Sequence, residues 1–375
     1  MSGGPALLAA GGTGGHLFPA EALAHVLKQR GVAVELVTDA RALRYGDSFP
    51  ARAVHTIRSA TPRGGSVPSR IAAVARLGLG VVEALLLIRR LRPCVVIGFG
   101  GYPTVPPLIA ASLLRVPTVL HEANGVMGKA NRFLASRVGA IAAGFPLSDA
   151  ATDWRDKITV TGNPLRPNAL AAMNEPYPES DGRLRILVTG GSQGARVMAD
   201  VVPAAVAALP PELREKIIVT QQARPEDAAR VAGVYERAGV KAEIAPFFND
   251  LPLRIARAQL VIARSGASTV SELAAIGRAS ILVPLPHALD QDQAANAAVL
   301  QATGAAEVVR QENFTPRFLS ERLASFVANP GLLKLRAEGA KAAGVADAAE
   351  RLADLVLGVA QEKTQDQKET QETEI

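Results

Sequence analysis

"PALLAAGGTGGHLFPAEAL" (residues 5–23) has a counterpart in "LRILVTGGSQGARVMADVV" (residues 184–202). In each stretch a short apolar strand leads into a Gly-Gly-polar-x-Gly turn and then into a segment with helical spacing. After each of them the chain continues with alternating strand and helix patterns. The repeat predicts an α/β protein built from two doubly wound, Rossmann-like domains in tandem.

Composition places the join between the two domains. Residues 168–183, "NALAAMNEPYPESDGR", are rich in Pro, Asn, Glu and Asp and have no sustained period. We therefore expect an N-terminal domain over residues 1–165 and a C-terminal domain over 166–338. A helix at about 340–360 is expected to pack back on the N-terminal domain, and the polar residues 361–375 are expected to form a frayed tail.

The totals describe a globular chain with a preference for anionic partners. Hydrophobic residues make up 48% and charged residues 20% of 375, and the single cysteine, Cys94, excludes an intrachain disulfide and a cysteine-built metal site. The net charge of +6 favours nucleic acid, phosphorylated metabolites or an acidic membrane surface. With only 4% aromatic residues and no lysine-rich arm, nucleic acid is the least favoured of the three.

Neither a signal peptide nor a membrane span is expected. No basic segment precedes an apolar one at the N-terminus. The longest nearly uninterrupted apolar run, "LGLGVVEALLLI" at 77–88, has 12 residues, whereas a spanning helix needs about 20.

Residues 66–92 nevertheless suggest a membrane surface as a partner. They combine apolar side chains with arginines, a composition that suits docking on an anionic leaflet. We expect residues 81–88 to be mostly core and residues 70–79 to face the membrane. The side chains concerned are Ile71, Val74, Leu77, Leu79, Arg70, Arg76, Arg89, Arg90 and Arg92.

The glycine turns are candidate phosphate sites. A turn between a strand and a helix gathers unpaired backbone N–H groups at the positive end of the helix. The alternative is a packing turn without a ligand. A further glycine turn, "GFGGYPTVPPLIAA" at 98–111, follows the strand-like "CVVI". Two such turns in one domain, both at the carboxyl ends of parallel strands, favour a ligand.

A dinucleotide-binding oxidoreductase is a second interpretation of the first turn. Asp39 ends the strand-like "VAVELVTD", near where a ribose-binding acid would lie. However, "GGTGGHLFPA" has His16 and Leu17 where the third glycine of G-x-G-x-x-G would be. This departure disfavours the oxidoreductase.

In the second half, "ARSGASTVSELAAIG" at 263–277 reads as the end of a strand, a turn and a helix that ends at Gly277. Arg264 precedes the turn, and Glu272 lies in the first turns of the helix. An arginine, small hydroxyl residues and a helix N-terminus can hold a diphosphate, and a carboxylate can accept hydrogen bonds from ribose hydroxyls. The alternative for Glu272 is a solvated carboxylate or one paired with the helix dipole, as is usual for helix glutamates.

Taken together, these stretches resemble the MurG-type glycosyltransferases of peptidoglycan synthesis. That family transfers N-acetylglucosamine from UDP-N-acetylglucosamine to the undecaprenyl-diphosphate-linked muramyl pentapeptide. The matching stretches, in family order, are "GGTGGHLFPA", "GFGGYPT", "HEANGVMGKANR", "TGNPLRP", "GGSQGA", "ARSGASTVSELAAIG" and "PHALDQDQAANA". The resemblance implies a GT-B fold with two domains facing across a cleft. It also implies no cofactor and a peripheral location on the cytoplasmic face of the inner membrane.

The resemblance also implies roles for individual residues. The donor would contact Thr13, Gly14 and Gly15, its sugar Asn124, and its diphosphate Arg166 and Ser192. Gly100, Gly101 and Tyr102 would form an acceptor loop, and Phe248 corresponds to the uracil-binding position. Phosphate and ribose would be cradled by Ala267, Ser268, Thr269, Val270, Ser271 and Glu272, and the sugar would be reached by Gln293, with Gln291 and Asn296 nearby.

Three departures from the family pattern matter. The family more often has glutamine at Ala123 and proline at Met127, and an extra residue in "HALDQDQ" leaves open whether Gln291 or Gln293 reaches the sugar. Asp290 and Asp292 form an Asp-x-Asp like the metal signature of other glycosyltransferases. We interpret it as a polar loop without a metal, because the family stabilises its leaving diphosphate with helix N-termini and side chains; an assisting divalent ion is the alternative.

An α-linked donor and a β-linked product require inversion by one in-line displacement, with a base removing the proton of the acceptor's 4-hydroxyl. His16 is the first candidate, because it follows the first glycine turn and an imidazole suits proton transfer near neutral pH. Alternatively His16 only hydrogen-bonds the loop or the acceptor diphosphate. His121 is a second candidate that would otherwise brace its loop, and Glu122 would be structural or support the base.

Other functions stay open at this point. A UDP-N-acetylglucosamine 2-epimerase, or a transferase with another lipid acceptor, would share both halves, although "HEANG" and "GFGGYPT" argue against them. A nucleotide-binding regulatory module without catalysis would need neither loop.

Overall fold

The structure is a computed structural model, and it describes residues 4–11, 14–39, 49–61, 67–148, 153–179, 181–191, 194–286 and 292–373. The chain divides into two units. The N-terminal domain comprises Met1–Arg166 and Asp347–Ile375, and the C-terminal domain comprises Pro167–Ala346. The chain returns to the N-terminal domain after Ala346, later than the predicted residue 338, because helix α13 (Pro330–Ala342) belongs to the C-terminal domain.

The N-terminal domain contains a seven-stranded sheet within the described residues, in the order β3-β2-β1-β4-β5-β6-β7. All neighbouring strands are parallel. The order reverses between β1 and β4, the kind of switch point at which open α/β sheets bind ligands. The strands are β1 (Ala6–Ala9), β2 (Val34–Thr38), β3 (Ala53–Thr56), β4 (Val95–Gly98), β5 (Thr118–Glu122), β6 (Ala140–Ala143) and β7 (Ile158–Val160).

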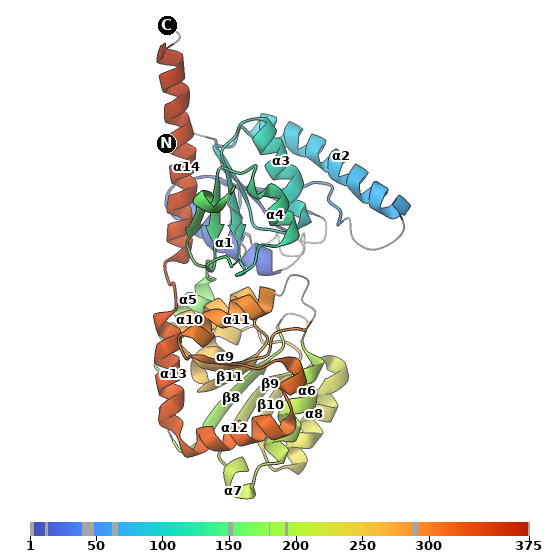
Figure 1. The fold of residues 1–375 in the computed structure, drawn as a ribbon, viewed down its shortest axis with the longest axis vertical. Coiled ribbons are helices and arrows are strands. Elements are labelled where there is room, and N and C mark those ends of the chain that lie inside the picture. Colours follow the sequence, from blue (N-terminus) through green and yellow to red (C-terminus); the bar gives the residue numbers. More distant parts are fainter. Residues whose placement is uncertain are drawn as a thin grey trace. The chain divides into compact units, whose positions relative to one another are not determined.

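Helices cover both faces of this sheet (Figure 1). The helices are α1 (Gly14–Gln29), α2 (Val67–Leu91), α3 (Val105–Leu113), α4 (Lys129–Ala135) and α14 (Ala348–Thr373). One core cluster joins α1 and α14 to the sheet through Leu8, Leu23 and Leu352, and the other joins α2, α3 and α4 to it through residues such as Leu108. Burial on both faces explains the nearly uninterrupted apolar strands in the sequence.

The last helix, α14, packs on the N-terminal domain, as expected for a helix at about 340–360. α14 buries Ala349, Leu352 and Val356, and Asp354 pairs with Arg30 just after α1. The expectation of a frayed tail was wrong for residues 361–373, which continue α14. This segment contains no Gly or Pro and is rich in Glu, Gln and Lys, which are good helix formers.

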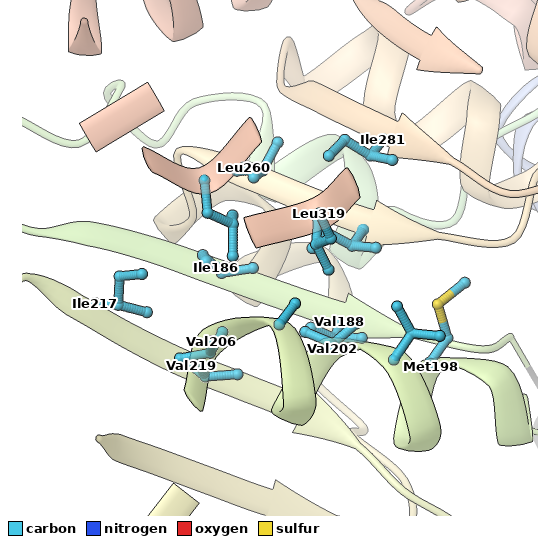
Figure 2. Close-up of a cluster of buried hydrophobic side chains, with 14 of the residues drawn as sticks. Ile186, Val188, Met198, Val202, Val206, Ile217, Val219, Leu260, Ile281 and Leu319 are labelled. Carbon is cyan, nitrogen blue, oxygen red and sulfur yellow. The ribbon is translucent and has the colours of Figure 1, made fainter. Parts of the chain in front are cut away.

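The C-terminal domain contains a six-stranded parallel sheet among the described residues, in the order β10-β9-β8-β11-β12-β13. Its core packs Ile186, Val188 and Val219 of the sheet against Met198 and Leu319 of the helices (Figure 2). The two parallel sheets confirm the predicted doubly wound α/β class. The strands are β8 (Leu184–Thr189), β9 (Ile217–Gln222), β10 (Lys241–Ala245), β11 (Leu260–Ala263), β12 (Ala279–Leu282) and β13 (Ala306–Val308).

The helices of this domain include α10, which ends at Gly277 in the left-handed conformation, with φ 77°. Glycine adopts that conformation readily, so the predicted helix end is confirmed. With α13, the helices are α5 (Pro167–Ala172), α6 (Arg196–Ala207), α7 (Pro211–Arg214), α8 (Pro225–Arg237), α9 (Leu251–Arg257), α10 (Ala267–Ile276), α11 (Asp292–Ala302) and α12 (Pro316–Ala328).

Helix α2 exposes more of its apolar side chains than the sequence predicted. In the described residues one segment, Pro68–Leu91, is long and apolar enough to cross a membrane. An apolar stretch of 18 residues within it has a mean hydropathy of 2.2, and 17% of that stretch is buried. Core helices of soluble proteins pass the same test of length and composition. Residues 81–88 are only partly core: Ala84, Leu87 and Ile88 are buried, but Val82 and Leu86 are 53% and 62% exposed. The helix therefore presents an apolar face along its whole length.

Candidate active site

Three loops at the carboxyl ends of β1, β4 and β5 bring the predicted N-terminal residues together. These strands are neighbours in the sheet. α1 begins at Gly14, so Gly14, Gly15 and His16 form its first turn, and Thr13 lies outside the described residues. Gly11, two residues after the end of β1, is so closely packed that a Cβ there would lie 3.0 Å from the Pro103 side chain.

The imidazole of His16 lies against the backbone of Gly100 and Gly101. A Cβ on Gly100 would lie 3.2 Å from His16 Cδ2, and a Cβ on Gly101 would lie 3.3 Å from Cε1. Both glycines also have positive φ, 92° and 76°. Two independent constraints, close approach and left-handed backbone, therefore require glycine at this turn.

The surroundings of His16 favour a neutral ring. Its Nδ1 lies 3.2 Å from the carbonyl oxygen of Gly11. In a neutral ring, donation from Nδ1–H to that oxygen leaves the lone pair on Nε2. Burial lowers the pKa of His16 below its usual value, and the bond to Gly11 acts in the opposite direction. The arrangement suits a group that accepts a proton.

His121 lies behind the same turn and is completely buried. Its ring centroid is 5.4 Å from that of Phe99. Burial, and secondarily the charge of a protonated His16, lowers the pKa of His121 to about 4. His121 is therefore neutral at neutral pH. Its complete burial supports the interpretation that it braces the loop, since a base must meet the substrate.

Glu122, the last residue of β5, organises the "HEANG" loop. Its carboxylate accepts hydrogen bonds from Asn124 N at 3.0 Å, Asn124 Nδ2 at 3.1 Å, Gly128 N at 3.0 Å and Asn131 Nδ2 at 2.7 Å. Burial raises the pKa of Glu122, and these hydrogen bonds act in the opposite direction. The carboxylate thus fixes Asn124 and the loop around it.

The two departures in this loop are accommodated by its structure. Ala123 contributes its carbonyl oxygen, which accepts a hydrogen bond from Asn163 Nδ2 at 2.9 Å. Met127 is fully buried in the core. Asn131 and Asn163 were not singled out in the sequence, and only their places in the quoted motifs marked them.

Arg166 lies beside the first glycine turn. Its guanidinium stacks on the ring of Phe18 in α1, 4.1 Å from the ring centroid. Tyr102 begins a short 3₁₀ helix, Tyr102–Thr104, whose Thr104 hydroxyl donates to the Gly101 carbonyl oxygen at 2.7 Å. The N-terminal domain therefore gathers His16, the acceptor-loop residues, Asn124 and a cation at one edge of its sheet.

In the C-terminal domain, α10 begins after Gly266, a residue that has no side chain with which to cap the helix. Ala267, Ser268 and Thr269, in the first turn of the helix, are half-buried. Uncapped N–H groups at the positive end of a helix bind anions. Further along, Val270, Ser271 and Glu272 are buried, with Glu272 only 6% exposed. Burial argues against a solvated carboxylate at Glu272, while pairing with the helix dipole stays an alternative to ribose binding.

Arg264 makes hydrogen bonds that the sequence did not predict. Its guanidinium is 8% exposed and donates to the carbonyl oxygens of Val283 at 2.9 Å and Pro284 at 3.0 Å, and to Gln311. Burial lowers the pKa of Arg264. We conclude that Arg264 holds the segment after β12 in place, and its contact with the diphosphate stays a prediction.

The predicted sugar contacts are linked to the turn that precedes α10. Gln293 Oε1 accepts from Leu285 N at 3.0 Å, and the Gln293 carbonyl oxygen accepts from Ser265 Oγ at 2.7 Å. The buried Asn296 donates to the Ser265 carbonyl oxygen at 3.1 Å. Ser192, Asp290 and Gln291 lie outside the described residues. Within the described ranges no three metal-binding side chains gather.

The ring of Phe248, the residue predicted to meet uracil, is buried. The ring is 7% exposed and lies under the guanidinium of Arg254, 4.2 Å from its carbon. Phe247, by contrast, is 60% exposed. Burial of the Phe248 side chain fixes the backbone at this position.

Comparisons with known proteins agree with this arrangement. The profile of the glycosyltransferase family 28 N-terminal domain matches residues 6–143, and that of the family 28 C-terminal domain matches residues 185–352. The chain is 56% identical over 357 residues to a UDP-N-acetylglucosamine--N-acetylmuramyl-(pentapeptide) pyrophosphoryl-undecaprenol N-acetylglucosamine transferase of Rhodopseudomonas palustris (strain BisA53), covering 94% of this chain and 96% of that protein. It is 53% identical over 363 residues to the protein of the same name from Agrobacterium fabrum, covering 96% of each.

Solved structures show the same similarity. The crystal structure of Acinetobacter baumannii MurG matches with a TM-score of 0.78 and 28% identity, covering 94% of this chain and 99% of that one. A UDP-GlcNAc 2-epimerase from Neisseria meningitidis matches with a TM-score of 0.66 at 14% identity, covering 94% of this chain and 100% of that one. The second match reflects a shared fold alone.

The buried His121 predicts a specific dependence of stability on pH. Below pH 6.5 the unfolded chain binds a proton on this ring that the folded chain does not bind until about pH 4. The free energy of unfolding should therefore fall as the pH falls through this window, by on the order of 3 kcal/mol in total from this ring. His121→Phe should lose that part of the pH dependence. Urea unfolding of both proteins at pH 7, 6, 5 and 4 tests this, and parallel curves would contradict it.

Proposed function

The chain belongs to the family of UDP-N-acetylglucosamine--N-acetylmuramyl-(pentapeptide) pyrophosphoryl-undecaprenol N-acetylglucosamine transferases, and from that premise we propose that it converts lipid I to lipid II. In this reaction N-acetylglucosamine moves from UDP-N-acetylglucosamine to the 4-hydroxyl of the muramyl residue. The observation that carries the proposal is the neutral His16, held against the Gly100–Gly101 turn at the switch point of the N-terminal sheet.

The C-terminal domain is proposed to bind the donor. The diphosphate would accept hydrogen bonds from the backbone N–H groups at Ala267–Thr269, the positive end of α10. Glu272 would accept hydrogen bonds from the ribose hydroxyls, and the backbone of Phe248 would meet uracil. Further contacts to diphosphate and sugar are proposed for Thr13, Gly14, Gly15, Asn124, Arg166, Ser192, Gln291 and Gln293.

The N-terminal domain is proposed to supply the base. As the acceptor's 4-oxygen forms its bond to the anomeric carbon, Nε2 of His16 takes the hydroxyl proton. The bond from the anomeric carbon to the diphosphate oxygen breaks on the opposite side, and UDP leaves with the electron pair. Attack and departure on opposite sides invert the configuration. The helix dipole of α10 stabilises the negative charge that grows on the leaving diphosphate.

A transfer assay with labelled UDP-N-acetylglucosamine and a lipid I analogue tests the proposal. Release of UDP that depends on the acceptor, together with a labelled lipid product, is the expected result. Isomerisation of the donor without acceptor would indicate a 2-epimerase. Binding of UDP-N-acetylglucosamine without either reaction would indicate a regulatory module.

His16→Ala should lower kcat by about 100-fold or more, the usual scale for losing a general base. The KM for the donor should change little, because His16 acts on the acceptor hydroxyl. His25→Ala, a partly buried histidine on the same helix, is the matched control. A loss of less than about tenfold with an unchanged pH profile would assign the base elsewhere.

Glu272→Gln should raise the KM for UDP-N-acetylglucosamine by about tenfold or more, because a buried polar contact to ribose is lost. The wild type should also discriminate against a 2′-deoxyuridine donor, and the variant should not, since a site built to hydrogen-bond a hydroxyl rejects its absence. Equal discrimination by both proteins would remove Glu272 from the ribose site.

The exposed face of α2 is proposed to dock on an anionic leaflet at the cytoplasmic side of the membrane. Ile71, Val74 and Leu79 are 64%, 60% and 51% exposed, and Arg70 and Arg76 are exposed beside them. Figure 1 shows the start of α2 projecting from its domain. Basic residues near an anionic surface contribute about 1 kcal/mol each, in addition to the apolar area that is buried.

Replacing Ile71, Val74 and Leu79 by serine should therefore weaken binding to phosphatidylglycerol vesicles while transfer to a short-chain soluble acceptor persists. Leu335→Ser, at a site that is 65% exposed in the other domain, serves as the control. Cosedimentation equal to that of the wild type would show that another surface docks.

A further inference from the structure

Gln222 is a buried amide outside every glycine motif, and all of its hydrogen-bonding groups are used. It is the last residue of β9 and is 7% exposed. Its Oε1 accepts from Thr189 Oγ1 at 2.9 Å and from Gly190 N at 3.1 Å. Its Nε2 donates to the carbonyl oxygens of Gly191 at 3.0 Å and Pro246 at 3.2 Å. A primary amide has two acceptor sites and two N–H donors, so this one is saturated.

The two segments joined by this amide are those proposed to meet opposite ends of the nucleotide. Gly190 and Gly191 begin the "GGSQGA" turn, proposed to contact the diphosphate. Pro246 immediately precedes Phe247 and Phe248, proposed to contact uracil. Among the described residues, no backbone hydrogen bond joins Gly190 or Gly191 directly to Pro246, and the Gln222 amide spans the two segments.

The described ends of the turn are closely packed. A Cβ on Gly190 would lie 2.1 Å from Ala195 N, so the chain folds back closely on itself. Arg224, two residues beyond Gln222, donates to the Gly194 carbonyl oxygen at 3.3 Å. The described ends of the turn are therefore both held by the segment that follows β9.

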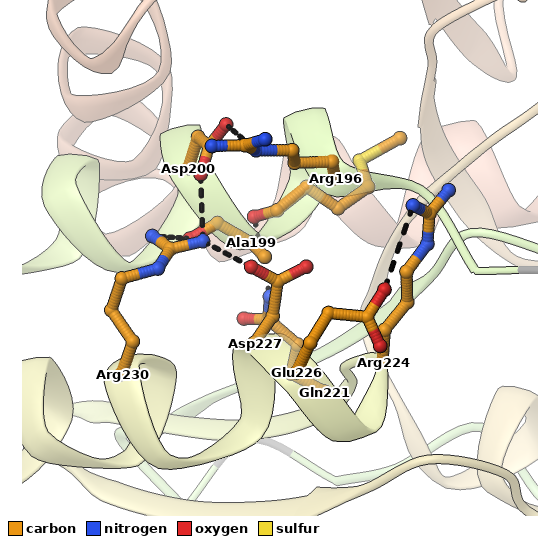
Figure 3. Close-up of polar contacts among 9 residues, drawn as sticks. Arg196, Ala199, Asp200, Gln221, Arg224, Glu226, Asp227 and Arg230 are labelled. Carbon is orange, nitrogen blue, oxygen red and sulfur yellow. Dashed lines mark hydrogen bonds and ion pairs between the residues drawn. The ribbon is translucent and has the colours of Figure 1, made fainter.

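The helices after the turn and after β9 are also tied together. Figure 3 shows the guanidinium of Arg230 on α8 between Asp200 of α6 and Asp227 of α8, with Arg224 and Glu226 at the start of α8. These ion pairs are mostly exposed and contribute little energy. They do, however, orient α6 relative to α8, and so maintain the setting in which Gln222 acts.

We propose that Gln222 is a positioning residue for the UDP donor, an inference that rests on the proposed function and deepens it. The ribose sets the separation between uracil and diphosphate, so one UDP contacts both segments only when they are held at that separation. Gln222 fixes it before the donor arrives. Binding then does not have to order the two loops.

The chemistry of the contacts requires glutamine. Methionine has a similar length but would leave two carbonyl oxygens and two donors without their partner. Glutamate would keep both accepted bonds and, when ionised, would lose both donated ones. Gln221 provides a matched control, because it is also buried but donates to Met198 O at 3.2 Å and accepts from Tyr235 OH at 2.6 Å, neither of which lies in these loops.

The test compares Gln222→Met with Gln221→Met. Both variants should lower the melting temperature. Only Gln222→Met should raise the Kd for UDP and the KM for UDP-N-acetylglucosamine by about tenfold or more, the loss expected when more than one buried hydrogen bond is broken. The KM for the acceptor should not change. A wild-type Kd for UDP in Gln222→Met, or an equal rise in Gln221→Met, would overturn the proposal.

Gln222→Glu provides a second test, the pH dependence of the affinity for UDP, if the methionine variant folds poorly. Its protonated carboxyl can donate one hydrogen bond, so its affinity for UDP should recover as the pH falls, relative to the wild type over the same range. A pH dependence identical to that of the wild type would contradict the role. Because UDP affinity is measured without turnover, a wild type that binds UDP but transfers no sugar would overturn the proposed reaction alone.

Discussion

Backbone groups at the carboxyl end of a parallel sheet lose their ladder partners, and the rest of this site depends on how they are satisfied. A buried N–H or C=O without a partner costs about as much as a lost hydrogen bond, roughly 1–3 kcal/mol. Each domain meets this constraint with one buried polar side chain at the last residue of a strand. Glu122 accepts four hydrogen bonds at the end of β5, and Gln222 accepts two and donates two at the end of β9.

The identity of each side chain follows from the groups it has to satisfy. The loop after β5 turns donors inward, so an acceptor-only carboxylate fits despite its burial. The turn after β8 and the segment after β10 present both donors and carbonyl oxygens, so only an amide fits. Arg264 solves the complementary problem, where carbonyl oxygens alone point inward. These choices hold the loops still, so that His16 and the α10 N-terminus are organised before any ligand is present.

Local sequence patterns were sufficient for the fold but not for these contacts. The strand–glycine turn–helix units, the left-handed end of α10 at Gly277 and the gathering of His16 with the second glycine turn follow from spacing and from parallel topology. The contact of the His16 imidazole with Gly100 and Gly101 could not be predicted in this way. The partners are far apart in the chain, and each glycine can be explained locally. The hydrogen bonds of Arg264 could not be predicted for the same reason, since their carbonyl acceptors follow another strand.

Apolar composition also led to a wrong prediction for α2, because it does not distinguish a side chain in the core from one on an exposed apolar face. Val82 and Leu86 have the spacing of core residues, and nothing local tells a core-facing stripe from one that faces a membrane. Only the packing of α2 against α3 shows which residues are left outside. For the polar segment 361–373 the prediction failed in the opposite direction, because its low hydrophobicity suggested fraying. Its high helix propensity instead lets it continue the packed helix α14.

Burial of His16 has two opposing effects on a base. It lowers the pKa of His16, which favours the neutral ring, but a lower pKa also weakens proton abstraction. The second effect is reduced if the proton moves late, when the acceptor oxygen is already bonding to the anomeric carbon and has become strongly acidic. A late transfer also limits the time that an imidazolium stands in a desolvated site beside the neutral, buried His121. An inverting displacement with an oxocarbenium-like carbon provides this timing, because the bond to the diphosphate can break well ahead of the new bond. The leaving diphosphate then carries most of the developing negative charge, and a helix N-terminus, such as that of α10 in the donor site proposed above, stabilises such a charge.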